Sequence, residues 1–318
     1  MNSQLKTDDA ECALGIDIGG TNTVFGICSQ QGEILYESSV HTRTVLSPEG
    51  LAKSIHDHLE EKNLLNCIRA IGIGAPNGNN LSSTIEFAPN LPWKGIIPLG
   101  EIFENAFGVP VSVTNDANAA ALGEMVFGNA QDLKHFVTIT LGTGLGSGII
   151  VNGELIYGHD GFAGEYGHIQ VIPDGRLCGC GRKGCLETYV SATGVVRSIA
   201  ELQSVSKATS VLIEKNVTSA REIFEYADAG DQFAQEIIDY TAEILGKSLA
   251  NFACFSSPKA FVLFGGIAQS GEKFASKVKE HMEANMLNIY KNKVEIRISS
   301  LHNVNAAVLG SASLVWSK

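Results

Sequence analysis

Four residues that could bind a metal ion lie close together in the sequence: His168, Cys178, Cys180 and Cys185. The pattern His-x9-Cys-x-Cys-x4-Cys contains several glycines, so the loop could fold its four soft ligands into the tetrahedron that Zn²⁺ prefers. The alternatives are a disulfide or free thiols. A disulfide would leave one of the three thiols unpaired and is uncommon in a reducing compartment, so the spacing favours zinc. Four protein ligands close the coordination shell, which predicts a structural metal.

Carboxylates near this cluster and near a predicted turn could carry further chemistry. We expect the zinc to fix the loop that presents Glu165 and Glu187.

Asn115 and Asp116 stand where a predicted strand ends and a helix begins, and simple N-capping by Asp116 would explain them. Capping is compatible with catalysis. A carboxylate at this end of a strand faces the crevice of an α/β sheet, where Asp116 could accept the proton of an attacking hydroxyl while Asn115 holds the substrate.

Three glycine turns follow predicted strands and could bind a nucleotide. Gly19-Gly20-Thr21-Asn22 offers backbone N–H groups to a phosphate, although a plain hairpin turn is the alternative. Asp17 favours the phosphate site, because a carboxylate inside an apolar strand needs a partner such as Mg²⁺. Gly142-Thr143-Gly144 would hold the other phosphates, and Gly265-Gly266 would let a nucleoside lie against the following helix. The P-loop pattern Gly-x-x-x-x-Gly-Lys-Ser/Thr is absent.

An α/β fold is predicted around these residues. Apolar runs and turn signals predict strands at 13–18, 23–28, 33–40, 68–75, 110–114, 259–264 and 294–298, and helices at 48–63, 99–107, 116–127, within 191–255, from 270 and at 303–316. Ile139–Gly144 can be aligned with Ile16–Thr21, which suggests two related halves, although chance produces such matches. The segment 76–95 contains three prolines and no periodic pattern, so it is a candidate substrate loop.

Composition and charge exclude several classes of protein. With 318 residues, of which 44% are hydrophobic, the chain can bury a large core and form two domains. The net charge of −11 gives nucleic acids no general attraction, so we expect no nucleic-acid partner. Residues 1–12 read as a short flexible tail and not as a signal peptide. No stretch approaches the ~20 apolar residues of a membrane helix, so we expect a cytoplasmic protein with no membrane association.

Taken together, these motifs resemble the ROK family of sugar kinases and sugar-responsive repressors, and within it the bacterial glucokinases. The resemblance extends over nearly the whole chain. It rests on five segments: Gly15–Thr21, Pro89–Trp93, Asn115–Ala120, Leu141–Gly146, and Gly164-Glu165-x-Gly167-His168 with the three cysteines and Glu187. The sequence departs from many members at Ala75-Pro76-Asn77-Gly78-Asn79, where they have a Pro-Gly turn.

The resemblance implies an actin/hexokinase-like (ribonuclease H-like) fold, with two domains around a central cleft. The implied domains are a smaller one at 13–116 plus 303–318 and a larger one at 117–302, which carries the zinc loop. A homodimer is also implied.

The resemblance implies a role for each residue that matches a functional position in the family's motifs. Asp116 matches the catalytic base, and the sugar-binding positions are Asn90, Asn115, Asp116, Glu165, His168 and Glu187. His168 would use one ring nitrogen for zinc and the other for a sugar hydroxyl, because a metal on one nitrogen fixes the tautomer of the other. Cys178, Cys180 and Cys185 match the other zinc ligands. The nucleotide positions are Asp17, Gly19, Gly20, Thr21, Gly142, Thr143, Gly144, Gly265 and Gly266.

The resemblance implies that ATP with Mg²⁺ phosphorylates a hexose, glucose before others, at its primary hydroxyl. N-acetylmannosamine, N-acetylglucosamine, fructose or mannose would use the same polar positions, and polyphosphate is an alternative donor. A sugar-sensing ROK regulator is the alternative from another functional class. Such regulators carry a DNA-reading domain ahead of the shared core, and the twelve residues before the first hairpin are too few to form one.

Overall fold

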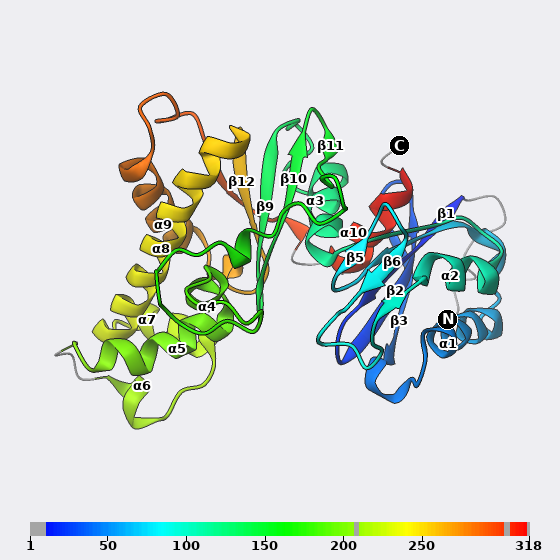
Figure 1. The fold of residues 1–318 in the computed structure, drawn as a ribbon, viewed down its shortest axis with the longest axis horizontal. Coiled ribbons are helices and arrows are strands. Elements are labelled where there is room, and N and C mark those ends of the chain that lie inside the picture. Colours follow the sequence, from blue (N-terminus) through cyan, green and yellow to red (C-terminus); the bar gives the residue numbers. More distant parts are fainter. Residues whose placement is uncertain (1–10, 207–209, 302–305, 317–318) are drawn as a thin grey trace. The chain divides into compact units, whose positions relative to one another are not determined.

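A computed structural model describes residues 11–206, 210–301 and 306–316 of the chain. It divides into two compact units (Figure 1). Unit 1 comprises the described residues of Met1–Asp132, Leu155–Ala163 and Ser300–Lys318, and unit 2 comprises those of Leu133–Glu154 and Gly164–Ser299. Residues 1–10 of the expected tail and 303–305 of the expected last helix lie outside the described residues. The domain boundaries implied by the resemblance remain a prediction.

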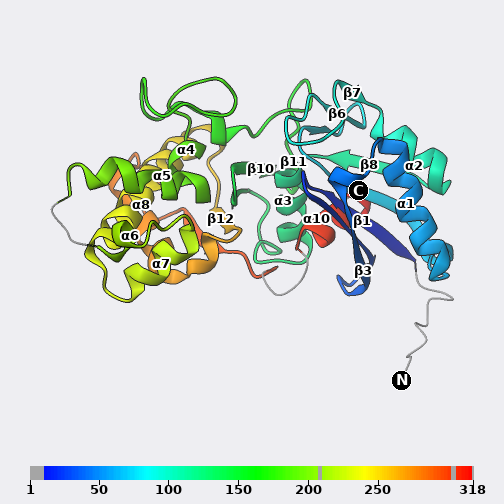
Figure 2. The same cartoon turned by 90° about the horizontal axis from the view of Figure 1, so that it is seen from below.

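The sheet of unit 1 has the strand order β3-β2-β1-β4-β8. The first three strands pair antiparallel, whereas β4 and β8 run parallel to β1. The bounds are β1 (Cys12–Ile18), β2 (Asn22–Ser29), β3 (Ile34–His41), β4 (Ile68–Gly74) and β8 (Val111–Thr114). Two pairs of helices cover the two faces of the sheet (Figure 2): α1 (Pro48–Glu61) with α2 (Leu99–Phe107), and α3 (Asp116–Val126) with α10 (Ala306–Trp316).

Side-chain alternation along β1 places Asp17 on the face that α3 and α10 cover. Leu14, Ile16 and Ile18 point to the other face and are buried in the core beneath α1 and α2. On the α10 side, a Cβ at Gly15 would collide with the carbonyl of Val308, so glycine lets the helix approach the strand closely. Asp17 lies two residues further along, on the same side as the start of α3.

The segment expected to be a long loop contains a small sheet. Its strands are β5 (Gly78–Asn79), β6 (Thr84–Glu86) and β7 (Ile96–Ile97), in the order β5-β6-β7. The expectation of a structureless segment at 76–95 was therefore wrong. Strands of two or three residues are too short to give an alternating pattern, and their burial at Ile85 and Ile97 depends on the rest of unit 1.

The sheet of unit 2 repeats the strand order of unit 1, as β11-β10-β9-β12-β13. Its first strand also pairs antiparallel with the second and parallel with the fourth, which supports two related halves. The strands are β9 (Phe136–Leu141), β10 (Leu145–Val151), β11 (Glu154–Leu155), β12 (Ala260–Phe264) and β13 (Glu295–Ile298). The helices are α4 (Glu187–Val190), α5 (Ala192–Gln203), α6 (Val211–Glu214), α7 (Ala220–Asp228), α8 (Gln232–Ser256) and α9 (Glu272–Asn285).

Short 3-10 helices complete the secondary structure, at Thr42–Thr44, Leu65–Cys67, Tyr166–His168 and Ala268–Ser270. None of the helices in the described parts of the chain combines the length and the apolar character that crossing a bilayer requires. The longest, α8, carries acidic and basic residues along its exposed side, including Asp239, Glu243 and Lys247.

Candidate active site

Asp116 is the first residue of α3, at the carboxyl end of β8. The residue that caps the helix is Asn115, whose Oδ1 accepts the N–H of Asn118 at 2.7 Å. N-capping by Asp116 was therefore the wrong expectation, because Asn115 has the extended backbone of a cap and Asp116 is already helical. The Oδ1 atom of Asp116 accepts the N–H of Ala117 at 2.9 Å. This bond orients the carboxylate and leaves its second oxygen available for a substrate.

Asp17 and Asp116 are electrostatically coupled inside unit 1. Asp17 pairs with Gly74 across β1 and β4, and a Cβ at Gly74 would lie 3.8 Å from the Cα of Asp116. Burial, followed by the neighbouring charge of Asp116, raises the pKa of Asp17 to about 7. Asp116 reaches solvent, yet the protein around it also raises its pKa by removing water from the carboxylate. Two such carboxylates favour a cation or a proton close to them.

The first glycine turn lies against the predicted substrate loop. A Cβ at Gly20 would stand 2.8 Å from the carbonyl oxygen of Asn90 and 3.3 Å from its Cβ, so the two segments are in close contact. Thr21 is held through its carbonyl, which accepts the N–H of Thr42 at 2.8 Å. Gly19 donates its N–H to the carbonyl of Asn22 at 3.0 Å and closes the turn. Unit 1 therefore brings together five of the predicted positions near Asp17: Gly19, Gly20, Thr21, Asn90 and Asp116.

The predicted metal ligands converge in unit 2. One ligand atom each from His168, Cys178, Cys180 and Cys185 lies within 4.8 Å of the others. Cys178 Sγ lies 3.6 Å from His168 Nδ1, and Cys180 Sγ lies 3.7 Å from Cys185 Sγ. Burial raises the pKa of the Cys178 thiol to about 12. A metal ion would therefore have to displace a tightly held proton there, so its affinity should increase with pH.

The two ring nitrogens of His168 face different groups. Nδ1 faces Cys178, whereas Nε2 lies 3.9 Å from the Oε2 atom of Glu165. The ring is partly exposed and Glu165 is exposed, so Nε2 is accessible to a ligand. Such an arrangement allows one nitrogen to bind a metal while the other binds a hydroxyl group.

Glu187 connects the cysteine loop to the second glycine turn. Its Oε1 accepts a hydrogen bond from the Cys178 thiol at 3.6 Å, and its Oε2 accepts the N–H of Leu145 at 3.0 Å. Gly144 comes so close to this carboxylate that a Cβ would lie 2.5 Å from Oε2. A side chain at position 144 would therefore push the Glu187 carboxylate away from the turn.

The other two glycine turns meet at the carboxyl ends of adjacent strands, β9 and β12. Gly265 has a φ of +98°, and a Cβ there would be 2.7 Å from the carbonyl oxygen of Leu141, directly before Gly142. The carbonyl of Gly142 accepts the N–H of Ala192, and that of Thr143 accepts the hydroxyl of Thr193 at 3.0 Å. The turn thus lies at the N-terminus of α5, where helix N–H groups favour anions. Gly142, Thr143 and Gly266 are exposed.

One residue of the cysteine loop, Arg176, was missed in the sequence. Its side chain is 3% exposed and forms an ion pair with Glu201 at 2.8 Å. A single arginine in a polar loop gives no signal of burial, since loop arginines are mostly exposed. Only the fold shows that this one lies under the loop.

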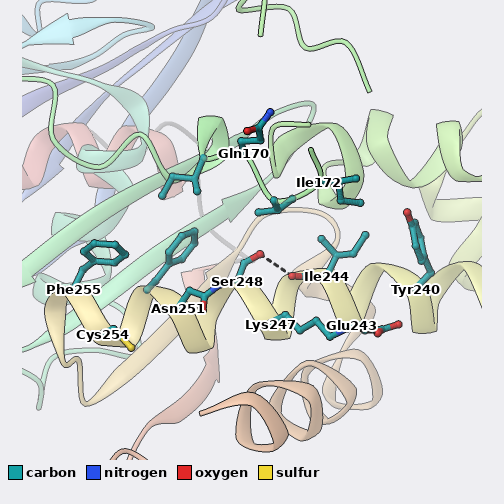
Figure 3. A pocket seen from close by; sticks show the side chains of 13 residues that line it. Gln170, Ile172, Tyr240, Glu243, Ile244, Lys247, Ser248, Asn251, Cys254 and Phe255 are labelled. Carbon is teal, nitrogen blue, oxygen red and sulfur yellow. Dashed lines mark hydrogen bonds and ion pairs between the residues drawn. The ribbon is translucent and has the colours of Figure 1, made fainter. Parts of the chain in front are cut away.

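A separate cavity of about 770 Å³ lies along α8 (Figure 3). Apolar side chains such as Ile172, Ile244 and Phe255 line it, together with Asn251 and Lys247 from the helix. None of the predicted site residues lines this cavity. The lining of this cavity is mostly apolar and suits packing against an apolar surface. A sugar-binding site would instead have several polar side chains directed to one point.

The similarity to known proteins agrees with this geometry. A model of the ROK family matches residues 13–318. The chain belongs to the ROK family. The glucokinase of Halalkalibacterium halodurans is 37% identical over 95% of this chain and 94% of that protein. The glucokinase of Streptomyces coelicolor is 35% identical over 95% of this chain and 96% of that protein.

Solved structures of other ROK proteins show the same fold. The ROK family glucokinase from Streptomyces griseus, in complex with glucose and AMPPNP, has a TM-score of 0.79 and 34% identity over 95% of this chain and 98% of that one. The ROK hexokinase from Thermus thermophilus has a TM-score of 0.78 and 29% identity over 95% and 97% of the two chains. The expected actin/hexokinase-like fold is confirmed. The family also contains regulators: a xylose repressor of Caldicellulosiruptor bescii is 30% identical over 97% of this chain and 79% of the repressor.

Proposed function

We propose that this ROK protein is an ATP-dependent glucokinase, which transfers the terminal phosphoryl group of ATP to the primary hydroxyl O6 of glucose. The observation that carries the proposal is the state of Asp116. It stands at the end of a strand with one oxygen held by Ala117, the other available, and a raised pKa. A base of this kind suits the removal of a proton from an attacking alcohol.

The other polar positions would hold the sugar. Asn115 uses its Oδ1 to cap α3, so the groups that it would offer to a sugar oxygen are the two N–H donors of its amide. In unit 2, Glu165, His168 and Glu187 offer two carboxylates and a ring nitrogen for vicinal hydroxyls. We propose that Asn90, Asn115, Asp116, Glu165, His168 and Glu187 are the hexose-binding residues, because they match the sugar-binding positions of the family. Exclusion of water around the sugar would prevent transfer of the phosphoryl group to water.

A structural zinc ion suits the cluster of His168, Cys178, Cys180 and Cys185. Three soft sulfur ligands and one ring nitrogen, all within 4.8 Å of one another, are a donor set typical of closed zinc sites. Bound zinc would stabilise the loop and would take no part in the reaction. The residues of the loop would then present Glu187 and the Nε2 atom of His168 in fixed directions.

ATP would bind through the glycine turns. We propose that Gly142, Thr143, Gly144, Gly265 and Gly266 hold phosphates and nucleoside, and that Gly19, Gly20 and Thr21 are further nucleotide-binding residues. Mg²⁺, when bound with ATP, neutralises charge on the phosphates. Asp17, with its pKa of about 7, would interact with this ion or its waters. A homodimer and the lack of a nucleic-acid partner remain predictions.

The test is ADP release from the purified protein with glucose, mannose, fructose, N-acetylglucosamine or N-acetylmannosamine, and with ATP or polyphosphate as donor. We expect the highest kcat/KM with glucose and ATP. Asp116→Asn should lower kcat by about 100- to 10,000-fold and leave glucose binding measurable by calorimetry. Asp57→Asn, at a partly exposed position on α1 where the carboxylate pairs with Lys53, is the control and should have the activity of wild type. ADP release that does not depend on any hexose, or normal turnover by Asp116→Asn, would refute the proposal.

A further inference from the structure

A buried arginine holds the cysteine loop against two helices of unit 2. Arg176 directs all five N–H donors of its guanidinium to the protein. Nε and Nη2 donate to the two carboxylate oxygens of Glu201, each at 2.8 Å. Nη2 also donates to Ser198 Oγ at 2.9 Å, and Nη1 donates to the carbonyls of Thr188 at 2.6 Å and Gly194 at 2.8 Å. These acceptors belong to α4 and α5, so one side chain joins the loop to both helices.

The backbone of Arg176 reinforces this attachment. Its N–H donates to the Tyr189 hydroxyl at 2.9 Å, and its guanidinium carbon lies 4.4 Å from the centre of the Tyr189 ring. Its carbonyl accepts the N–H of Gly184 at 2.8 Å, directly before the metal-binding residue Cys185. Arg176 therefore contacts α4 through Thr188 and Tyr189 and contacts the end of the cysteine loop through Gly184.

Glu187 is the first residue of this short helix. Cys185 holds α4 from its N-terminal side, since its carbonyl accepts the N–H of Thr188 at 3.0 Å and the Thr188 hydroxyl at 2.7 Å. Arg176 holds it from the other side through the Thr188 carbonyl. A helix of one turn has too few internal hydrogen bonds to be stable alone, so its direction depends on these external contacts.

We propose that Arg176 is a positioning residue: it fixes the direction of the Glu187 carboxylate toward the hexose, independently of the metal. The inference rests on the proposed function, because it concerns the affinity for sugar. The planar five-donor fork is essential to the role. A lysine side chain has three N–H donors on a single nitrogen, so it cannot form the five hydrogen bonds to acceptors on both α4 and α5.

The experiment compares Arg176→Met and Arg176→Lys with Arg197→Met. Arg197 is a matched control, because it also donates to the cysteine loop, at the Leu177 carbonyl, but from an exposed position and through one bond. In both Arg176 variants we expect KM for glucose to rise about tenfold or more while KM for ATP changes less than about twofold. Arg197→Met should match wild type. Equal changes in the two KM values, or no change in either, would overturn the proposal.

Two further measurements separate this role from metal binding and from the proposed function. Zinc content should stay the same in Arg176→Lys, and loss of zinc would overturn the claim of independence from the metal. Amide hydrogen exchange in the peptide containing Glu187–Val190 should be faster in the Arg176 variants than in Arg197→Met. If wild type phosphorylates no hexose, the proposed function fails, and this exchange rate alone decides whether Arg176 positions α4. Unchanged exchange would then refute it.

Discussion

Asp17 and Asp116 destabilise the folded, ligand-free protein when their carboxyl groups are charged. Asp17 is partly buried beside Asp116, and both carboxylates have raised pKa values because the folded protein disfavours their charged forms. A carboxyl group whose pKa is higher in the folded state binds more protons there than in the unfolded state. The contribution of such a group to the free energy of unfolding is therefore greatest below its unfolded pKa. It decreases as pH rises toward the folded pKa, which is about 7 for Asp17.

We predict that Asp17→Asn stabilises the ligand-free protein above pH 7. The amide removes a charge that the fold disfavours, so the free energy of unfolding at pH 8 should increase by on the order of 2–4 kcal/mol. At pH 4.5 the gain should be much smaller, because Asp17 is already largely protonated there. Urea unfolding at the two pH values measures both quantities, with Asp57→Asn as the control. An equal gain at both pH values would contradict the prediction.

Individual residues differ in how well the sequence predicted their place. Asp17 could be singled out because a charge in an apolar strand needs a partner, and the structure places it beside Asp116. The spacing of His168, Cys178, Cys180 and Cys185 indicated that they would come together, and the structure places their ligand atoms within 4.8 Å of one another; that they hold zinc stays a prediction. The cap of α3 was assigned one residue too late, because Asn and Asp are almost equally good caps and adjacent positions cannot be distinguished by type. The pairing of Glu187 with Leu145 depends on tertiary structure and has no sequence signal.

At the scale of elements, most strands of four or more residues were predicted, the strands of two or three residues were missed, and the helices α5 to α8 were predicted only as a helical region within 191–255. α1 begins where Ser47 and Pro48 indicated, with Ser47 Oγ accepting the N–H of Gly50 at 3.1 Å. The strands β5 to β7 escaped notice, since pairs of residues carry no period. The turn before β5 has a left-handed backbone conformation at a position other than glycine. Asn77 occupies the position where many ROK members have glycine, and it adopts a φ of +53°.

We predict that position 77 tolerates glycine and rejects β-branched residues. Asn77 accommodates the left-handed backbone at modest cost, and its Nδ2 donates to the carbonyl of Glu86 at 2.9 Å. Asn77→Gly should change the free energy of unfolding by less than about 1 kcal/mol, whereas Asn77→Val should lower it by about 1–3 kcal/mol. Thermal unfolding of both variants provides the measurement. A valine variant as stable as the glycine variant would show that the turn is not constrained in this way.

At the scale of the whole molecule, the two units have separate hydrophobic cores. One core contains residues of unit 2 such as Phe233, Phe252 and Phe274, and another contains residues of unit 1 such as Phe25 and Phe103. The repeated glycine hairpin in the sequence predicted two related halves, and the matching strand orders support it. The return of Leu155–Ala163 to unit 1 could not be predicted, because nothing in its composition distinguishes it from a loop of unit 2.

The separate cores predict that loss of the metal destabilises one unit more than the other. The chain has two tryptophans, and both lie in unit 1: Trp93 is buried and Trp316 packs edge-on against Phe127. Tryptophan fluorescence therefore reports unfolding of unit 1, while circular dichroism at 222 nm reports the helices of both units and receives its larger share from unit 2. Cys180 is the exposed cysteine of the proposed zinc site, so Cys180→Ser should release zinc with little change in packing.

In Cys180→Ser, the midpoint of the dichroism transition should fall by about 5–10 °C, and the fluorescence midpoint should move much less. Cys254→Ser is the matched control, because Cys254 is exposed on α8 of the same unit and lies outside the metal cluster. It should retain one equivalent of zinc and both midpoints. Retention of zinc by Cys180→Ser would contradict the ligand assignment. An equal fall of both midpoints would instead mean that the two cores unfold as one cooperative structure, so that the zinc loop stabilises the site residues of both units together.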